Sequence, residues 1–305
     1  MEVQDFRSGY VALIGPPNAG KSTLLNYLAG EKLSIISPRP QTTRFMVRAI
    51  ITFPEAQIVF VDTPGFLDTD KLKTPVERAF VVKALKVLEE VDIITAIVEA
   101  RMPGEEELFL LEKLQEMDKR IILALNKIDR VKEEYLNSLL EEYRKWGEFH
   151  RIIPISAKKG TNISILVGEI IMALPLRPPL YPEEMKTDIP SHLRVGELIR
   201  EKIFHLTYQE VPYATLVKVE EILDRGKVLY IKGIILVEEP SQKGILVGKG
   251  GRMIREIGKR AREELERIFQ KKIYLDLEVK VEKGWRRRMS SLKELGISEG
   301  GETSV

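Results

Sequence analysis

Short apolar runs alternate with segments of helical period along the first half of the chain. Apolar runs predict strands at Tyr10–Ile14, Ala49–Phe53, Ile58–Val61, Ile93–Val98, Ile121–Leu125 and Ile152–Ile155. Between them, apolar positions of helical spacing predict helices at Lys21–Leu28, Thr74–Glu89, Glu105–Met117, Glu133–Tyr143 and Ile163–Ala173. Because alternating strands and helices are typical of a mainly parallel sheet with helices on both faces, residues 8–174 are predicted to form one α/β domain.

The pattern changes at Leu174–Pro190, where five prolines disfavour both helix and sheet and predict an extended linker over residues 175–190. Beyond it, the predicted elements are a helix Ser191–His205 capped by Ser191, strands Ala214–Leu223 and Val228–Val237 about a turn at Asp224–Gly226, a short helix Ser241–Val247, a basic helix Arg252–Phe269 and a strand Ile273–Val281. Residues 191–288 are therefore predicted to form a second, α+β domain, followed by a tail at residues 289–305.

Composition agrees with two domains and adds a charge asymmetry. The 305 residues carry a net charge of +2, but residues 191–290 hold 22 Lys and Arg against 15 Asp and Glu, and the remainder holds 26 against 31. A basic second domain predicts a polyanionic partner for that domain alone, with a solvated Lys/Glu surface as the alternative. Cysteine is absent, which excludes disulfides and thiolate metal sites. No uncharged apolar run approaches the ~20 residues of a membrane span, and the N-terminus lacks a signal-peptide core, so we expect a cytoplasmic protein.

A phosphate-binding motif lies between the first predicted strand and helix. Gly15-Pro16-Pro17-Asn18-Ala19-Gly20-Lys21-Ser22, followed by Thr23, matches GxxxxGK[ST] in the context that this motif requires. Gly15 and Gly20 permit a loop whose N–H groups surround phosphates at a helix N-terminus. Lys21 is then expected to neutralise the β and γ phosphates, and the Ser22 hydroxyl to bind Mg²⁺. The alternative is an ordinary glycine turn before a helix.

Three more motifs follow predicted strands in the order expected of a guanine-nucleotide site. In Asp62-Thr63-Pro64-Gly65, Asp62 can hold Mg²⁺ through water and the Gly65 N–H can approach a γ-phosphate. In Asn126-Lys127-Ile128-Asp129, the carboxylate of Asp129 can accept both guanine donors, N1–H and N2–H₂, which adenine lacks. Lys127 can lie along the base, and Asn126 can tie neighbouring loops together. The third motif is Ser156-Ala157-Lys158, in which the Ala157 N–H can donate to guanine O6. Together these motifs predict GTP or GDP binding at the carboxyl ends of the strands.

A glycine loop opens the basic helix of the second domain. Gly248-Lys249-Gly250-Gly251 matches the GxxG loop with which KH domains clamp single-stranded RNA, and the order of the predicted elements fits the type II KH arrangement. Lys249, Arg252 and Arg255 are expected to meet phosphates. Trp285 with Arg286, Arg287 and Arg288 can add stacking and charge, with a solvated tail as the alternative.

These motifs together resemble the Era family of ribosome-associated, Ras-superfamily GTPases, which join a P-loop G domain to a type II KH domain. The resemblance implies that Gln41-Thr42-Thr43-Arg44-Phe45 is switch I, with Thr43 as a Mg²⁺ ligand and Thr42 as the alternative. It also implies that Asp62 to Phe66 form switch II. Phe66 stands where Ras-like proteins place a water-orienting glutamine, so slow intrinsic hydrolysis is expected. In relatives with this change, an asparagine equivalent to Asn18 can hold K⁺; a loop-bridging amide is the alternative.

The family resemblance also implies partners. It predicts binding near the 3′ end of 16S rRNA, a role in small (30S) ribosomal subunit assembly, peripheral contact with the inner membrane and a monomeric state. Two other hypotheses keep the GTP site: a GTPase that aids tRNA modification, and a GTPase timer whose C-terminal domain docks a protein.

Overall fold

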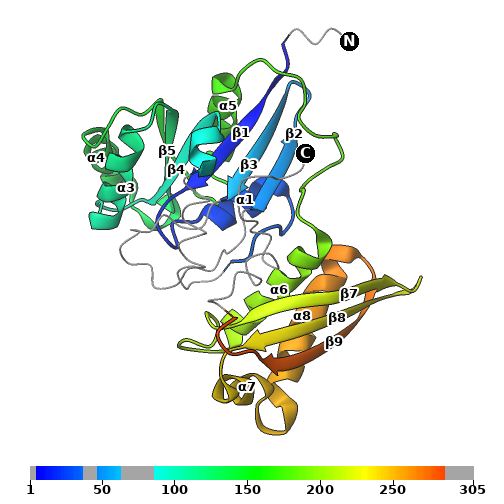
Figure 1. Ribbon diagram of the computed structural model, residues 1–305. Helices are drawn as coiled ribbons and strands as arrows, with labels where there is room; N and C mark the ends of the chain where they lie inside the picture. The colour runs from blue at the N-terminus through cyan, green and yellow to red at the C-terminus, as the bar shows by residue number, and fades with distance from the viewer. Residues whose placement is uncertain (1–4, 37–46, 63–85, 286–305) are drawn as a thin grey trace. The chain divides into compact units, whose positions relative to one another are not determined.

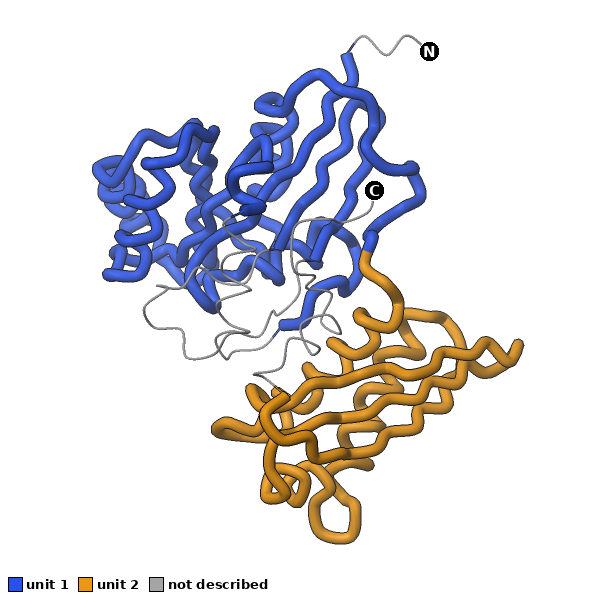
Figure 2. Tube along the Cα trace, viewed as in Figure 1, with its two compact units in different colours: residues 1–72, 80–188 blue, residues 73–79, 189–305 orange. Residues whose placement is uncertain are grey.

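The computed structural model describes residues 5–36, 47–62 and 86–285 of the 305 (Figure 1). The chain divides into two compact units, residues 1–72 with 80–188 and residues 73–79 with 189–305 (Figure 2). The predicted switch I, Thr63 to Phe66 of switch II and Arg286 to Arg288 lie outside the described residues. Most of the predicted helix Thr74–Glu89 does so as well, although residues 86–90 are helical.

In the described part of the first unit, six strands form one sheet in the order β2-β3-β1-β4-β5-β6. The strands are β1 (Arg7–Ile14), β2 (Val47–Thr52), β3 (Ala56–Asp62), β4 (Ile93–Glu99), β5 (Arg120–Asn126) and β6 (Arg151–Pro154). All neighbouring strands of this sheet pair in parallel except β2 and β3, which are antiparallel. Every residue of β3 is buried, as expected of a central strand covered on both faces. The six predicted strands are confirmed with small shifts at their ends.

The sheet is covered by α1 (Lys21–Ala29), α3 (Glu105–Gln115), α4 (Glu133–Arg144) and α5 (Ile163–Ala173). One core cluster joins Leu110 and Leu114 of α3 and Tyr143 of α4 to the apolar side chains of β1, β4 and β5. This packing fixes the strands, so their carboxyl ends place five loops along one edge of the sheet. The described residues of the predicted P-loop and guanine motifs lie at or directly after the carboxyl ends of β1, β5 and β6, and Asp62 ends β3.

Residues 175–188, called the connector below, differ from a free linker. They are extended, but they bind the first unit, whose boundary therefore lies at Asp188 and not at Leu174. The buried side chain of Gln57 accepts hydrogen bonds from the N–H groups of Leu180 and Tyr181, at 2.8 and 2.9 Å, and donates to the carbonyl of Tyr181 at 2.9 Å. Farther along, the Ile50 N–H of edge strand β2 donates to the carbonyl of Lys186 at 2.9 Å.

The second unit contains α6 (Ser191–Leu206), β7 (Leu216–Asp224), β8 (Val228–Val237), α7 (Pro240–Val247), α8 (Arg252–Phe269) and β9 (Lys272–Val281). Its described sheet has the order β7-β8-β9, antiparallel between β7 and β8 and parallel between β8 and β9. Ile199 of α6 and Ile257 and Leu265 of α8 pack against Ile231 of β8. The predicted order of elements is confirmed.

One detail of α6 differs from prediction. Pro190 occupies the cap position and Ser191 is the first helical residue, with no side-chain capping bond. Because Ser191 is already helical, its hydroxyl is not at the cap position, and the Pro190 side chain has no acceptor for the first N–H groups of α6. Within the described ranges, no helix is long and apolar enough to cross a membrane.

Candidate nucleotide and nucleic-acid sites

The loop between β1 and α1 is held in a shape that only glycine permits at two positions. Gly20 has φ 109°, and a Cβ there would collide with the side-chain amide of Asn126. A Cβ at Gly15 would collide with the carbonyl of Ile97 in β4. Pro16 and Ala19 are buried, Pro17 and Thr23 are half-buried, and Asn18 is exposed with φ 62°. The loop thus presents backbone N–H groups at the start of α1, where an anion is favoured.

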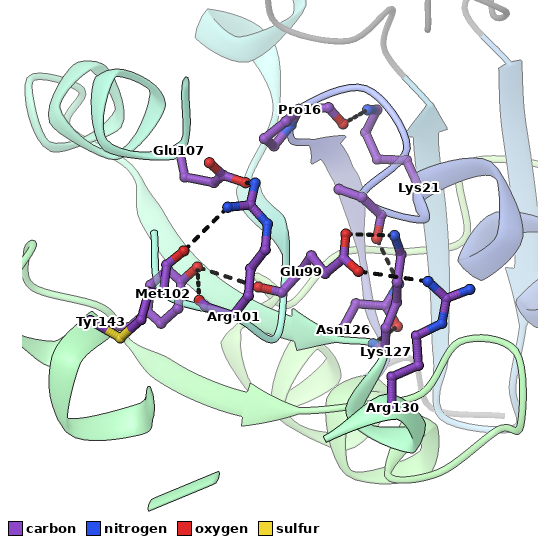
Figure 3. A network of polar contacts seen from close by, with 11 residues as sticks. Pro16, Lys21, Glu99, Arg101, Met102, Glu107, Asn126, Lys127, Arg130 and Tyr143 are labelled. Atoms are coloured by element: carbon purple, nitrogen blue, oxygen red, sulfur yellow. Dashed lines mark hydrogen bonds and ion pairs between the residues drawn. The ribbon is translucent and has the colours of Figure 1, made fainter. Parts of the chain in front are cut away.

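Lys21 is buried and folds back on this loop. Its Nζ donates to the carbonyls of Gly15 and Pro16 at 2.8 and 2.9 Å (Figure 3). Burial lowers the pKa of Lys21 to about 8, although the nearby carboxylate of Asp62 opposes the shift. Neutral carbonyls stabilise an ammonium less than anions do. The side chain is therefore poised to exchange these partners for phosphate oxygens.

Asp62 ends β3 beside the loop and is fully buried. Its Oδ2 accepts hydrogen bonds from the hydroxyls of Ser22 and Ser34, both at 2.8 Å, whereas the buried Oδ1 has no hydrogen-bond partner within residues 5–36, 47–62 and 86–285. Burial raises the pKa of Asp62, with Lys21 acting in the opposite direction. An unpaired carboxylate oxygen next to a serine hydroxyl is the oxygen donor set that Mg²⁺ prefers, so these residues fit the implied cation. The sequence did not reveal Ser34, because no motif includes it.

The predicted guanine loops are joined by Asn126 at the end of β5. Its Nδ2 donates to the carbonyl of Ala19 at 2.7 Å, and its Oδ1 accepts from the N–H groups of Lys127 and Ala157 at 2.8 and 2.9 Å. Asn126 therefore ties the phosphate loop to both base loops, as expected. In this structure the Ala157 N–H, predicted to meet guanine O6, is directed to the Asn126 amide oxygen.

The side chains that would contact the base come from the same two loops. Oδ1 of Asp129 accepts from the Ser156 hydroxyl at 2.6 Å, and this bond lowers the pKa of Asp129, so the carboxylate is ionised at neutral pH. Lys127 pairs with Glu99 at 2.8 Å, and Arg130 approaches the same carboxylate at 3.7 Å (Figure 3). Glu99, at the end of β4, is a positioning residue that no motif indicated. Lys158 is exposed next to Ala157.

The GxxG loop of the second unit lies between α7 and α8. Gly248, Gly250 and Gly251 have φ values of 70°, 61° and 75°, which glycine adopts without strain. Arg255, one turn into α8, donates from Nε to the carbonyl of Gly251 at 3.1 Å and also binds the carbonyl of Gly250. Arg255 therefore stabilises the loop by binding two of its carbonyls. Lys249 and Arg252 are exposed.

A groove of about 410 Å³ runs between α8 and β9. Apolar side chains and Gly258 line its length, and three cations stand along the α8 wall; the lining residues are Ile254, Arg255, Gly258, Lys259, Arg262 and residues 273–277. A groove with apolar side chains beside cations suits unstacked bases whose phosphates face the helix.

Comparisons with known proteins agree with both sites. The model of a family described as 50S ribosome-binding GTPase matches residues 10–127, and the model of the KH domain matches residues 210–286. The GTPase Era of Halothermothrix orenii is 45% identical over 293 residues, which are 95% of this chain and 98% of that protein. The GTPase Era of Lacticaseibacillus paracasei is 45% identical over 301 residues, 97% of this chain and 98% of its own. The chain belongs to the Era family of GTPases.

Solved Era structures match the whole fold. The crystal structure of an Aquifex aeolicus Era variant bound to GDP and AlF₄⁻ has a TM-score of 0.90 at 41% identity, covering 96% of this chain and 100% of that one. An Era complex with MgGDPNP and nucleotides 1506–1542 of 16S ribosomal RNA has a TM-score of 0.91 at 40% identity, with the same coverage. The Era-family resemblance, the P-loop G domain and the KH domain are therefore confirmed.

One predicted contact of this Era-family chain is wrong. Trp285 was expected to stack on RNA, but its side chain is only 1% exposed and its Nε1 donates to the carbonyl of Ala214 at 3.0 Å. A ring enclosed by the core and anchored by its N–H cannot offer a face to a base. Trp285 is instead a buried core residue of the second unit.

Proposed function

We propose that this chain is a GTP-hydrolysing switch that binds Mg²⁺-GTP in its first unit and single-stranded ribosomal RNA in its second. The enzymatic half depends above all on the buried cluster of Lys21, Ser22 and Asp62. Among the described residues, the buried ammonium of Lys21 donates to carbonyls and one oxygen of the Asp62 carboxylate has no hydrogen-bond partner, and both arrangements are costly. A triphosphate with its cation supplies the missing charge to each.

The phosphate groups would be held by the loop N–H groups and by Lys21. Mg²⁺, when bound, neutralises charge that develops on the transferred phosphoryl group. Ser22 would bind the cation directly, Asp62 through water, and Thr43 of switch I would complete the set. By the family resemblance, the switch residues Gln41 to Phe45 and Asp62 to Phe66 would sense the γ-phosphate; the second of these segments begins at Asp62 of the cluster itself.

Guanine selection would rest on Asp129. Its carboxylate, ionised and oriented by Ser156, can accept from N1–H and N2–H₂ together. Adenine would leave that carboxylate unpaired, at a cost of about 1–3 kcal/mol. Lys127 would cover one face of the base while Glu99 holds its ammonium, and Ala157 would turn its N–H from Asn126 to O6.

Hydrolysis would be slow without a partner, because Phe66 cannot orient water. We assign Asn18 the role of a K⁺ ligand: it lies exposed on the phosphate loop, in a left-handed backbone conformation. Replacing Na⁺ with K⁺ should accelerate hydrolysis in the unaltered protein and leave Asn18→Ala unaffected. Equal rates of the unaltered protein in the two salts would remove this role.

RNA binding would use the GxxG loop and the adjoining groove. The related Era structure that holds 16S rRNA nucleotides 1506–1542 supports the same RNA, near the 3′ end of 16S rRNA, as the partner of this chain, and with it a role in assembly of the small (30S) subunit. Backbone N–H groups of the loop and the side chains of Lys249 and Arg252 would meet phosphates, and the apolar groove floor would receive bases.

The decisive experiment changes the loop. In Lys249→Asp with Gly250→Asp, two carboxylates face the phosphates; the new side chain at position 250 meets open space, and aspartate tolerates the left-handed conformation there. RNA from the 3′ end of 16S rRNA should no longer bind, while GTP affinity persists. A control with the same charge change in the first unit, Lys113→Asp with Asn137→Asp, should keep both activities. Unchanged RNA affinity in the loop variant would favour a protein-docking role for the KH unit.

Finer properties follow from family membership. We propose that the protein is a cytoplasmic monomer that contacts the inner membrane peripherally. Sedimentation should give the mass of one chain, and vesicles with anionic headgroups should retain the protein at low salt. A dimer, or no retention at any salt concentration, would refute the corresponding statement.

A further inference from the structure

The sheet of the second unit carries a pair of stacked tyrosines on the face opposite its helices. Figure 1 shows α6 and α8 on one side of β7, β8 and β9. Tyr230 of β8 and Tyr274 of β9 are register partners on the other side, with ring centroids 5.8 Å apart and an interplanar angle of 16°. Tyr274 is 62% exposed. A large aromatic surface therefore faces solvent at this end of the sheet.

The pair is part of a longer stack. The guanidinium of Arg225, from the turn between β7 and β8, lies 4.5 Å from the ring centroid of Tyr230. The Tyr230 hydroxyl approaches the carboxylate of Asp276 at 3.4 Å, which further fixes its ring. Because β9 is an edge strand, Tyr274 ends the series, with one ring face covered by Tyr230. The remaining ring face continues the stack for any planar group that binds there.

The tyrosine pair lies beside the groove between α8 and β9. Tyr274 and Asp276 line the groove together with Arg262 of α8. The start of β9 lies near the C-terminal part of α8, since the Ile273 N–H donates to the Glu266 carboxylate at 3.1 Å. The GxxG loop precedes the opposite end of α8, and the eleven residues from Arg252 to Arg262 span about 15 Å. Tyr274 thus lies at the end of the groove distant from the loop.

We propose that Tyr274, supported by Tyr230 and Arg225, is a base-stacking platform that extends the RNA site beyond the four nucleotides that a KH loop clamps. The inference rests on the proposed RNA-binding function. The occupant is a base of the same RNA strand, and its identity matters little because every base has a π-face. Lys272, with a side chain 80% exposed, and Arg262 supply positive charge for the flanking phosphates.

The test compares two RNAs that share one four-nucleotide core from the 3′ end of 16S rRNA, one of them extended by about four nucleotides on each side. Tyr274→Ala should weaken binding of the extended RNA by about 5-fold to 150-fold and leave the core RNA unaffected. Tyr274→Phe, which keeps the ring, should bind both as the unaltered protein does. The matched control is Tyr135→Ala, a similarly exposed tyrosine on α4 of the first unit.

The possible results distinguish a base-stacking role of Tyr274 from RNA binding by the loop and groove alone. Equal affinity of Tyr274→Ala and the unaltered protein for the extended RNA overturns the platform. An equal loss for both RNAs does so too, since it indicates a purely structural pair. If the unaltered protein binds neither RNA, the proposed RNA-binding function is wrong, and the platform proposal, which depends on it, is wrong as well. Photoreactive iodouridine in the extension should crosslink to Tyr274 in the unaltered protein even if the alanine variant does not fold; crosslinks only elsewhere refute the proposal.

Discussion

Replacing Gln57 with leucine tests whether the connector is an integral part of the first unit. The Gln57 side chain is fully buried and makes four hydrogen bonds: it accepts from the N–H groups of Leu180 and Tyr181, and donates to the Tyr181 carbonyl and the Thr52 hydroxyl. Leucine has a similar volume but no polar atom. The change therefore removes the polar anchor while leaving the apolar packing nearly intact.

The magnitude follows from the groups that lose partners. Two backbone N–H groups and one backbone carbonyl of the connector lose their partner; a fully buried group would cost about 1–3 kcal/mol, and these part-buried groups cost less because water can reach them. The connector can limit the loss by detaching locally and exposing these groups to water, at the expense of its other bonds, such as that from Ile50 to Lys186. We therefore expect the free energy of unfolding to fall by about 2–4 kcal/mol, a large part of a typical stability of ~5–15 kcal/mol.

Urea unfolding and limited trypsin digestion measure the two effects. Digestion should accelerate at Lys186, which lies within the connector and is followed by threonine, because proteolysis follows the open population; Arg177 precedes a proline, which blocks trypsin. Local destabilisation by 2 kcal/mol corresponds to about a 30-fold faster cut. Gln115→Leu is the control: that exposed glutamine accepts from the Glu148 N–H, which water can satisfy instead. A loss below about 0.5 kcal/mol with unchanged digestion would show that the connector is a free linker, against the reasoning above.

Three further outcomes are expected at the nucleotide site. Lys21→Ala should abolish measurable GTP hydrolysis with the fold retained by circular dichroism; normal turnover with magnesium would refute the phosphate-loop assignment. Because the pKa of Lys21 is lowered to about 8 without nucleotide and phosphates favour the charged form, GDP binding at pH 8 or above should take up a proton, and calorimetry in buffers of different ionisation enthalpy should detect it. Lys21→Arg, always charged, should show no such uptake; equal uptake in both proteins would assign the proton elsewhere. Asp129→Asn should weaken GTP binding about 100-fold and favour xanthine nucleotides, as competition binding would show; unchanged discrimination would locate the base elsewhere.

Motifs predicted the nucleotide site because its chemistry is local. Gly20, Lys21 and Asp129 act within loops of a few residues, and the strand–loop–helix context that places them is visible as a change of apolar period. Their supporting residues were not predictable in this way. Ser34 and Glu99 meet Asp62 and Lys127 only after the strands have aligned, and a lone serine or glutamate carries no pattern of its own.

In the second unit, local composition does not decide whether an aromatic side chain is buried or exposed. Trp285 is followed by three arginines, a composition typical of an RNA contact. The Trp285 ring is nevertheless buried, and its N–H is bonded to the carbonyl of Ala214, a distant residue that no local pattern reveals. Tyr230 and Tyr274 lie 44 positions apart, yet parallel pairing of β8 and β9 makes them neighbours. The sequence alone therefore assigns aromatic residues to function or core poorly, because sheet register decides which ring faces solvent.

The connector presents the same problem for a whole segment. Its prolines exclude helix and sheet, so an extended conformation could be predicted, but an extended chain is free or docked according to what its backbone groups meet. Here Gln57, more than a hundred residues earlier, supplies donor and acceptor together to the backbone of Leu180 and Tyr181. Arg48 of β2 adds an ion pair to Asp188, the last residue of the first unit. The anchors lie on β2 and β3, the strands that follow switch I and precede switch II along the chain. The connector is thus bonded to the two strands that join the nucleotide-sensing segments, a placement that no property of residues 175–190 alone could have indicated.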